Sequence, residues 1–514
     1  MGDIHVLTFK LNLSPCDKAI IGKRFEYMFH IHNTIVSHAA KQLRKLKFDN
    51  AYTKLKTEYG TLIYDKNKKK KKLNKEETVR KKEITDAMNI ITKSYGLTQA
   101  DLEAYIKECG KRYSKHLSSQ QVQKEADRVF KGVEKVLYST GKHLHFKKYR
   151  DFHTISGKTN ANGIKFDKAK LSIEWNGLKI KCKNPSKKSA WYYAEALKGD
   201  ISYCEIERKM FPNGWHYYLL VYLRGAPPHT IKEVGSPYNI TGIDIGTSTI
   251  AAVSEDMAVL EELAPRTNEY NAGIAEIQKR MDISKRMSNP DKYRLDGTID
   301  KSNKGKWIFS KNYCRMRCRL GSLYRQKSTY IKQSHRILAN KLIKNSTSFV
   351  IENMSFKSLQ KKAKKTERSE KQTDIKNKNG TIKTIHKCKR KKRFGRSLNN
   401  RAPASLISII KEKATMYGGG LTKVDTKTFK ASQYDHSTGI YTKVGLNKRD
   451  KFVNGQYVQR DLYSAFLLKN SNKTYTEPVR KTCKEGFERF LNLQNELISE
   501  MKANNITMKQ CFGF

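Results

Sequence analysis

The feature that most constrains how this chain folds is a carboxylate embedded in an apolar strand. Residues 240–245 read Ile-Thr-Gly-Ile-Asp-Ile, so Asp244 has an isoleucine on each side. A second case ends the run Ser348-Phe-Val-Ile-Glu, where Glu352 follows three apolar residues. Continuous apolar runs are typical of strands that are buried on both faces of a sheet. Because a buried carboxylate is rare without a partner, we expect the fold to bring Asp244 and Glu352 together.

The elements around these two residues predict how they meet. The apolar patterning predicts strands at 240–245, 250–253 and 257–260, an amphipathic helix at 311–344, a strand at 348–352, a helix at 401–416, a strand at 421–424 and a helix from 461. This is the element order of a ribonuclease-H-like α/β domain, in which the first and fourth strands are neighbours. The start of the last of these helices then brings Asp461 to the same point.

Each acidic residue also has a plainer interpretation. Any single Asp or Glu is more often a surface charge than a ligand. Asp461 is also explained by the routine structural role of an aspartate at a helix N-cap. Asp425 follows the strand at 421–424 and is a candidate fourth acidic residue, for which we favour a surface role.

Three carboxylates that converge on one point offer hard oxygen ligands, which suit Mg²⁺ or Mn²⁺. A pair of such ions activates a water molecule and stabilises the leaving oxygen of a phosphodiester, so no general-base side chain is required. Without metal the carboxylates repel one another, and we expect raised pKa values. The predicted chemistry at Asp244, Glu352 and Asp461 is therefore metal-dependent hydrolysis.

The charge of the chain indicates the polymer that it binds. Its 514 residues include 103 Lys and Arg but 49 Asp and Glu, a formal charge of +54, which favours a nucleic-acid partner. Residues 357–396 hold 17 basic and 3 acidic residues and are expected to form a mobile basic insertion. The candidate nucleic-acid contacts are Arg315, Arg325, Lys332 and Arg336 on the helix at 311–344, and Lys391, Lys392 and Arg393 in the insertion.

The remaining composition indicates where the protein works. No stretch approaches the roughly 18 apolar residues of a membrane span, and the first residues lack the apolar core of a secretory signal. The nine cysteines are scattered and are interpreted as free thiols. We therefore expect a cytoplasmic protein with no membrane partner.

Three motifs resemble those of a known nuclease family. Gly242-Ile-Asp-Ile-Gly-Thr-Ser is similar to the first motif of the RuvC nuclease domain, Val350-Ile-Glu-Asn-Met-Ser to the second, and Gln459-Arg-Asp-Leu-Tyr-Ser-Ala-Phe to the third. Together they resemble TnpB, the transposon-encoded RNA-guided nuclease, and the compact type V CRISPR effectors. The resemblance implies an RNA-guided DNA endonuclease of a prokaryotic cell whose catalytic metal ligands are Asp244, Glu352 and Asp461. Its implied partners are a guide RNA and a double-stranded DNA target; the oligomeric state stays open, with a monomer favoured.

The resemblance and the patterning together predict a multidomain α+β protein. The expected domains are a split β-barrel wedge domain at 1–16 and 146–235, a helical recognition domain at 17–145, the RuvC domain at 236–425, a target-nucleic-acid-binding insert at 426–458, and the end of RuvC with a C-terminal helix at 459–514.

One departure from the family concerns zinc. Family members carry a zinc ribbon of two Cys-x-x-Cys pairs before the third motif, but this chain has no Cys from 425 to 460 and reads Ala431-Ser-Gln-Tyr-Asp-His where the ribbon begins. Cys314 and Cys318 lie one helical turn apart without a second pair. We therefore expect the insert to persist without zinc.

Three other functions fit parts of the sequence. A guide-dependent repressor that no longer cuts DNA would be expected to lack part of the carboxylate set, which is complete here. An actin-like or sugar-kinase-type phosphotransferase would use Asp244-Ile-Gly-Thr-Ser as a phosphate loop, but its only adenosine motif would be Gly418-Gly-Gly, which is typical of a helix-terminating turn. A resolvase-like nuclease without a guide would not need the helical and barrel regions.

Overall fold

The computed structural model describes residues 4–64, 71–138, 141–295, 297–360, 367–376, 382–389, 394–443, 445, 448–506 and 512–513. The chain is a mixed α+β protein that divides into two compact units, Met1–Thr230 and Ile231–Phe514. The division falls between Gly225-Ala-Pro-Pro and Gly235-Ser-Pro, whose glycines and prolines are typical of a linker.

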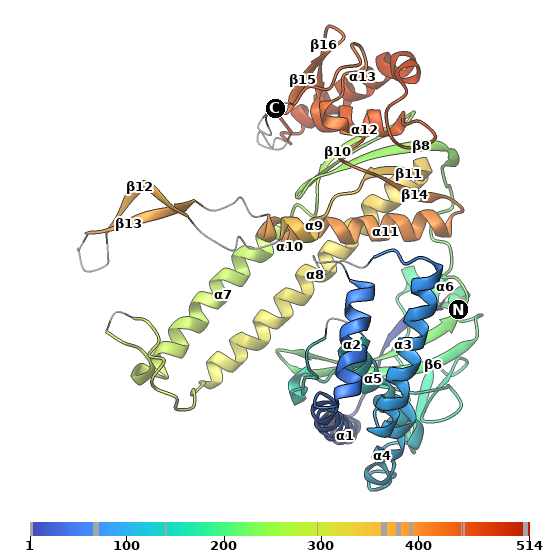
Figure 1. Ribbon diagram of the computed structural model, residues 1–514, viewed down its shortest axis with the longest axis vertical. Coiled ribbons are helices and arrows are strands. Elements are labelled where there is room, and N and C mark those ends of the chain that lie inside the picture. Colours follow the sequence, from blue (N-terminus) through green and yellow to red (C-terminus); the bar gives the residue numbers. More distant parts are fainter. Residues whose placement is uncertain are drawn as a thin grey trace. The chain divides into compact units, whose positions relative to one another are not determined.

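Unit 1 contains a helical part whose helices pack through apolar stripes. They are α1 (Pro15–Leu46), α2 (Asn50–Ile63), α3 (Lys75–Ser94), α4 (Gln99–Lys111) and α5 (Ser119–Tyr138) (Figure 1). Helix α1 begins at a capping box, in which Ser14 Oγ accepts from the Asp17 N–H and the Asp17 carboxylate accepts from the Ser14 N–H. The buried stripe of α1 includes Phe25, Met28 and Ile35, and it joins the same core as α5 and the strands of unit 1.

The strands of unit 1, which the sequence analysis expects in a β-barrel, belong to two sheets. One sheet has the order β1-β7-β6-β2 and the other the order β3-β4-β5. Their strands are β1 (Ile4–Lys10), β2 (Thr154–Ser156), β3 (Ile164–Asp167), β4 (Ser172–Trp175), β5 (Leu178–Lys181), β6 (Ile201–Phe211) and β7 (Gly214–Arg224), and α6 (Ala190–Ala196) lies between β5 and β6. The N-terminal strand pairs with β7, and an isolated bridge between Leu11 and Cys182 links the two sheets.

Unit 2 is built on a five-stranded sheet of order β10-β9-β8-β11-β14. Its strands are β8 (Ser236–Ile245), β9 (Thr249–Val253), β10 (Ala258–Glu262), β11 (Ser346–Glu352) and β14 (Gly420–Val424). The first three pair antiparallel, whereas β11 runs parallel to both β8 and β14. The first and fourth strands are therefore neighbours, as the sequence predicts.

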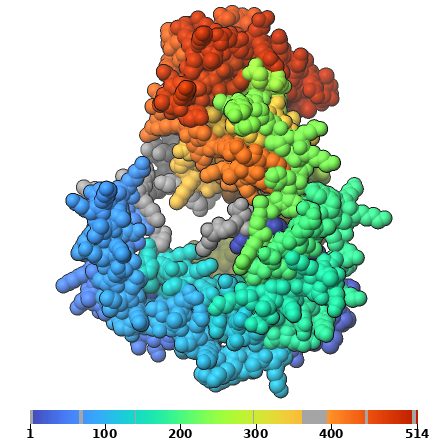
Figure 2. All heavy atoms as spheres, turned by 90° about the vertical axis from the view of Figure 1, so that its right-hand side faces the viewer, coloured from blue at the N-terminus to red at the C-terminus, as the bar shows by residue number. Residues whose placement is uncertain are grey.

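Helices cover both faces of this sheet. The helices of unit 2 are α7 (Thr267–Met287), α8 (Lys311–Asn345), α9 (Phe356–Leu359), α10 (Gly395–Arg401), α11 (Pro403–Met416), α12 (Arg460–Lys469) and α13 (Arg480–Ala503). Buried residues of α8 and α11 share one core with Ile243, Ile245 and Ile351, while those of α12 and α13 share the other core with Val253 and Val350. In Figure 1, α11 and α12 lie on opposite sides of the strands, and Figure 2 shows the C-terminal residues, in red, packed against the rest of unit 2. The strands that carry Asp244 and Glu352 are thus covered on both faces, as expected.

The long helix agrees with its predicted bounds of 311–344, and it lies beside α7. Its C-terminal half buries Ile331, Leu338 and Leu342, whereas Tyr324, which the periodicity places on the same stripe, is exposed. Within the basic insertion, β12 (Glu367–Lys376) and β13 (Ile382–Lys389) form an antiparallel hairpin that the sequence analysis did not predict. A second hairpin, β15 (Asp450–Val453) with β16 (Gln456–Gln459), leads directly into α12.

No helix in the described part of the chain combines the length and the apolar character that crossing a membrane requires.

Candidate acidic site

Strand register places Asp244 beside Glu352. The parallel pair β8–β11 aligns Ile243 with Ile351, so the next residue of each strand is Asp244 in one and Glu352 in the other. Because side chains alternate between the faces of a strand, both carboxylates lie on the face opposite to these isoleucines. That face is the one covered by α12, since Val350, two residues before Glu352, belongs to the core of α12.

A glycine lets α12 approach β8 closely enough to bring the third carboxylate in. A Cβ atom at Gly242 would lie 2.0 Å from the Ala465 carbonyl oxygen and 2.4 Å from the Lys469 backbone nitrogen, so only glycine permits this packing. Asp244 follows Gly242 by two residues on the same face of β8. Asp461 precedes Ala465 by four residues, about one helical turn, on the same side of α12. The contact between Gly242 and Ala465 therefore places Asp244 of β8 and Asp461 of α12 on the same side of the β8–α12 interface.

The charges of the other two carboxylates affect the protonation of Asp244. Burial raises the pKa of Asp244 well above its usual value, and the negative charges of Asp461 and Glu352 raise it further, while Arg460 and Arg449 act in the opposite direction. Like charges held together in a partly desolvated place disfavour ionisation in this way. Of the repulsion expected from the sequence, the part that acts on Asp244 is present.

Glu352 is held by the backbone of a segment distant in sequence. Its Oε1 atom accepts a hydrogen bond of 3.2 Å from the N–H of Ala431, which begins a short 3-10 turn, Ala431–Gln433. Burial raises the pKa of Glu352, and this hydrogen bond lowers it in part. Residues 431–433 thus orient a carboxylate of the site, a role that the sequence analysis did not assign to them.

Asp461 forms ion pairs with two arginines. Arg449 Nη1 lies 3.1 Å from Oδ2, and Arg460 Nη2 lies 3.3 Å from Oδ1. The Arg460 guanidinium also donates to the Lys448 carbonyl oxygen at 2.8 Å, which holds it in place. Asp461 and Arg460 expose 14% and 10% of their side chains, so these ion pairs are largely shielded from water.

The interpretation of Asp461 as a helix N-cap is wrong. The N-cap of α12 is Gln459, whose Oε1 accepts a 2.7 Å hydrogen bond from the Leu462 N–H, and the helix begins at Arg460. Asp461 therefore lies inside the first turn, where the helix dipole favours a negative charge. Its side chain is free from capping and faces the acidic site instead.

The donor atoms suit a hard divalent cation, but their arrangement is not a preformed metal cage. Among the described residues, no three or more His, Cys, Asp or Glu side chains gather closely enough to hold a metal ion. Asp244 and Glu352 fit such an ion chemically, because a cation would relieve the repulsion that raises the Asp244 pKa. The Asp461 carboxylate is engaged by Arg449 and Arg460, so it joins a metal only if those pairs rearrange.

The segment that would carry a zinc ribbon in the resembled family is packed here by aromatic residues. His436 is buried, and both its Nδ1 and its backbone nitrogen lie within hydrogen-bond distance of the Tyr463 hydroxyl, at 2.8 and 3.0 Å. Its ring also contacts the rings of Phe466 and Phe487. Burial lowers the pKa of His436, so the ring is held neutral inside this core.

The structure describes four of the seven predicted nucleic-acid contacts. Arg315, Lys332 and Arg336 are exposed on α8, and Arg325 is partly buried. The other three, Lys391, Lys392 and Arg393, lie outside the described residues.

Asp425 behaves as the plainer interpretation expects. It is exposed, and its Oδ1 accepts from the Lys427 N–H in a turn after β14. Gly418 follows the end of α11 with a φ of +78°, which agrees with its interpretation as a helix-terminating glycine rather than part of an adenosine motif.

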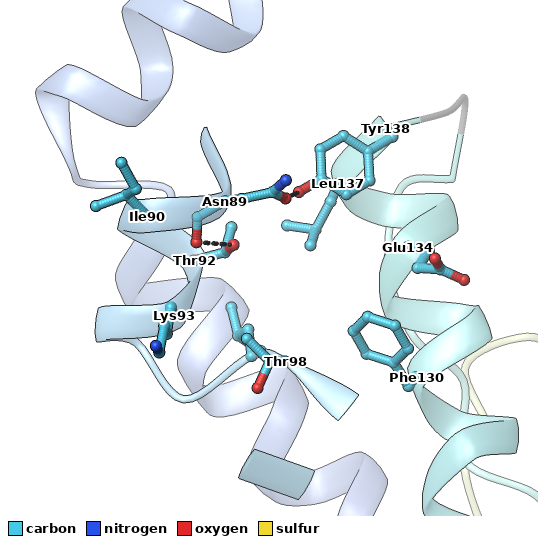
Figure 3. Close-up of a pocket in the computed structure, with 10 residues that line it drawn as sticks. Asn89, Ile90, Thr92, Lys93, Thr98, Phe130, Glu134, Leu137 and Tyr138 are labelled. Atoms are coloured by element: carbon cyan, nitrogen blue, oxygen red, sulfur yellow. Dashed lines mark hydrogen bonds between the residues drawn. The ribbon is translucent and has the colours of Figure 1, made fainter. Parts of the chain in front are cut away.

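The site is separate from the cavity drawn in Figure 3. That cavity, of about 320 Å³, lies in unit 1 between α3 and α5, with Asn89 and Tyr138 hydrogen-bonded across it. None of the predicted site residues lines it.

Comparisons with known proteins return a likeness in structure alone. No protein-family model matches the sequence, and no curated protein matches it either. The solved structures that resemble the chain over most of its length include two complexes of Cas12f. The cryo-EM structure of a Cas12f1–sgRNA–target DNA complex has a TM-score of 0.43 and 13% identity, and the match covers 92% of this chain and 99% of that one. A CRISPR–Cas12f ternary complex has a TM-score of 0.24 and 12% identity, with coverage of 91% and 99%.

Proposed function

We propose that this protein is an RNA-guided DNA endonuclease that hydrolyses phosphodiesters at Asp244, Glu352 and Asp461. The observation that carries the proposal is that β8, β11 and α12 bring these three carboxylates near one another, so that burial and the charges of Asp461 and Glu352 together raise the Asp244 pKa. A fold has no structural need for such a cluster, whereas a divalent cation needs it. The strand order around it supports the ribonuclease-H-like assignment.

In this proposal, Asp244 and Glu352 hold Mg²⁺ or Mn²⁺, and Asp461 completes the ligand set when its ion pairs open. The bound ions would supply an activated water molecule and charge stabilisation for the leaving oxygen. Ala431 holds Glu352 in a fixed orientation through its N–H. Arg449 and Arg460 offset the negative charge of the cluster, which would otherwise repel a phosphodiester.

The charge of +54 supports nucleic acid as both guide and target. With sequence recognition delegated to base pairing, the protein needs broadly distributed basic residues rather than one recognition helix. The exposed Arg315, Lys332 and Arg336 of α8 are proposed to contact RNA or heteroduplex phosphates. The same proposal includes the domains: wedge and recognition domains in unit 1, and a RuvC domain with an insert without zinc in unit 2. It also includes a location on nucleoid DNA.

The second candidate is a guide-dependent repressor that binds DNA without cutting it. The ion pairs of Asp461 with Arg449 and Arg460 favour this candidate, since a permanently paired Asp461 would leave an incomplete site.

One experiment separates the two. The full chain is expressed with its native flanking DNA, the RNA that copurifies is sequenced, and DNA matching that RNA is incubated with the complex and Mg²⁺. Cleavage of matched but not scrambled DNA supports the nuclease. Specific binding without cleavage supports the repressor, and absence of any copurified RNA contradicts both.

A further inference from the structure

The segment that follows α5 in unit 1 combines basic and aromatic residues on the surface. Residues 141–151 read Gly-Lys-His-Leu-His-Phe-Lys-Lys-Tyr-Arg-Asp and precede β2. Phe146 exposes 60% of its surface, and the neighbouring Lys142, Lys148 and Arg150 are exposed as well. Phe146 is one of several exposed apolar side chains of the described residues, and here it lies among cations beside a pocket.

Packing fixes this segment in an extended shape. The Asn33 side chain of α1 forms two hydrogen bonds of 3.0 Å with the backbone of Lys147, one to its N–H and one to its carbonyl oxygen. Leu144 packs against the core, and the Gly141 N–H donates to the Lys135 carbonyl oxygen at 3.1 Å. Phe146 is therefore held outward between two attached residues, Leu144 and Lys147.

A pocket of about 370 Å³ lies between this segment, α1 and α5. Its cationic lining residues are Arg128, Lys135, Lys142 and Lys147, and none of the described residues that line it is acidic. Its apolar lining residues are Val36, Val129, Val136 and Leu144. The pocket thus combines apolar and cationic lining residues, a combination that suits a nucleobase attached to a phosphate.

Two nearby carboxylates offset part of this charge. Glu205 Oε1 lies 3.7 Å from Arg128 Nη2. Glu125 is buried, lies 2.8 Å from Arg128 Nη1 and 2.6 Å from the His32 ring, and is 4.0 Å from Lys147 Nζ. Glu125 fixes the direction of Arg128, and among the described residues neither Glu125 nor Glu205 forms an ion pair with Lys135 or Lys142.

We propose that residues 141–150 and this pocket bind unpaired nucleotides. Phe146 stacks on one base, the pocket takes the neighbouring nucleotide, and Lys142, Lys148 and Arg150 contact phosphates. Stacking requires an exposed base face, so the site selects single strands over duplex. The inference deepens the proposed function, because a guide RNA and a displaced DNA strand both present unpaired nucleotides, but it does not depend on the acidic site.

The test measures binding by the full chain after bound nucleic acid has been removed. Fluorescence anisotropy is recorded with a short oligouridylate RNA, an oligothymidylate DNA and a mixed-sequence duplex. Phe146→Ala is expected to weaken single-strand binding about 10-fold, the loss of one stacked base, while duplex binding stays unchanged. The matched control is Phe48→Ala, because Phe48 is 87% exposed in the same unit and also follows basic residues, Arg44, Lys45 and Lys47, but does not belong to the segment that lines the pocket. Lys142→Ala is expected to lower the salt slope by about 0.7.

The RNA and DNA strands distinguish the two sources of ligand. Preference for oligouridylate assigns the site to guide RNA, and preference for oligothymidylate assigns it to a displaced DNA strand. Photocrosslinking with a 4-thiouridine strand is expected to label the peptide that contains Phe146. Any of three results would overturn the proposal. Phe146→Ala and Phe48→Ala could bind single strands with equal affinity, Phe146→Ala could weaken duplex binding as much as single-strand binding, or the crosslinks could be confined to other peptides. Loss of DNA cleavage in an Asp244 variant would leave these binding results unchanged.

Discussion

The close contact between α12 and β8 makes Gly242→Ala a sharp test of how the acidic site is assembled. The added Cβ would lie 2.0 Å from the Ala465 carbonyl oxygen, whereas real Cβ atoms essentially never come within 3.0 Å of another heavy atom. The obstructing atoms belong to the helix backbone and cannot rotate away. Helix α12 must therefore move by about 1 Å, because the surrounding core is close-packed and offers little slack.

This displacement has two expected costs. Overpacking of a core of this kind destabilises a protein by about 1–3 kcal/mol. Because α12 carries Asp461, the same movement shifts one carboxylate relative to Asp244 and Glu352, and a misplacement of about 1 Å costs on the order of 100-fold in rate. The assay combines thermal unfolding with single-turnover cleavage of matched DNA, measured below the unfolding transition.

The matched control is Gly420→Ala in β14 of the same sheet. No heavy atom lies within 4 Å of a Cβ at Gly420, so this variant should keep both stability and cleavage rate. If Gly242→Ala behaves like Gly420→Ala in both assays, α12 does not set the geometry of the site and the reasoning fails.

Further predictions concern the charges and the core around the site. Asp244 has a folded-state pKa raised above its ordinary value of 3.8, so the folded state binds the proton more tightly, and stability falls as pH rises from that ordinary value through the raised folded-state pKa. Asp244→Asn should remove this loss and raise the free energy of unfolding by about 1–2 kcal/mol more at pH 8 than at pH 4, as measured by thermal melts. A lower melting temperature of this variant at pH 8 would contradict the reasoning. Saturating Mg²⁺ should stabilise the wild type by about 3 kcal/mol at 100 times its Kd, but stabilise Asp244→Asn much less, as measured by the same thermal melts. Arg449→Ala removes a charge that lowers the Asp244 pKa, so an NMR titration should show that pKa higher still; an unchanged titration refutes the coupling. Tyr463→Phe leaves the buried His436 without its hydroxyl partner and should lower the free energy of unfolding by about 1–3 kcal/mol, as measured in urea. A zinc-selective chelator should leave the urea unfolding curve of the wild type unchanged. Destabilisation by the chelator would instead indicate bound zinc.

The sequence predicted the central part of the fold because local patterns and simple strand topology decide it. Apolar residues on both sides of Asp244 and before Glu352 identify strands that are covered on two faces, and the parallel crossover makes β8 and β11 neighbours. The position of Asp461 was predicted to within one residue of the helix start, yet its capping role was wrong, because N-cap identity depends on where the helix actually begins.

Contacts between distant segments could not be predicted in the same way. Arg449 precedes the β15–β16 hairpin, and Ala431 lies in a short turn, so neither has a local pattern that indicates contact with a carboxylate. A glycine in Gly242-Ile-Asp was a visible signal for close helix packing, but only the structure identifies the partner at Ala465. The hairpin β12–β13 was missed because its strands are rich in charged residues, which periodicity interprets as solvent-exposed chain.

The proposed function requires that DNA paired with a bound guide RNA is hydrolysed at the site of Asp244, Glu352 and Asp461. Its most direct test is the single-turnover cleavage rate of matched DNA in Mg²⁺, compared between the wild type and Asp244→Ala or Glu352→Ala, with RNA retention and DNA affinity measured in the same preparations. Either substitution is expected to abolish DNA cleavage while RNA binding persists. Full cleavage by either variant, with RNA and DNA binding intact, would contradict it.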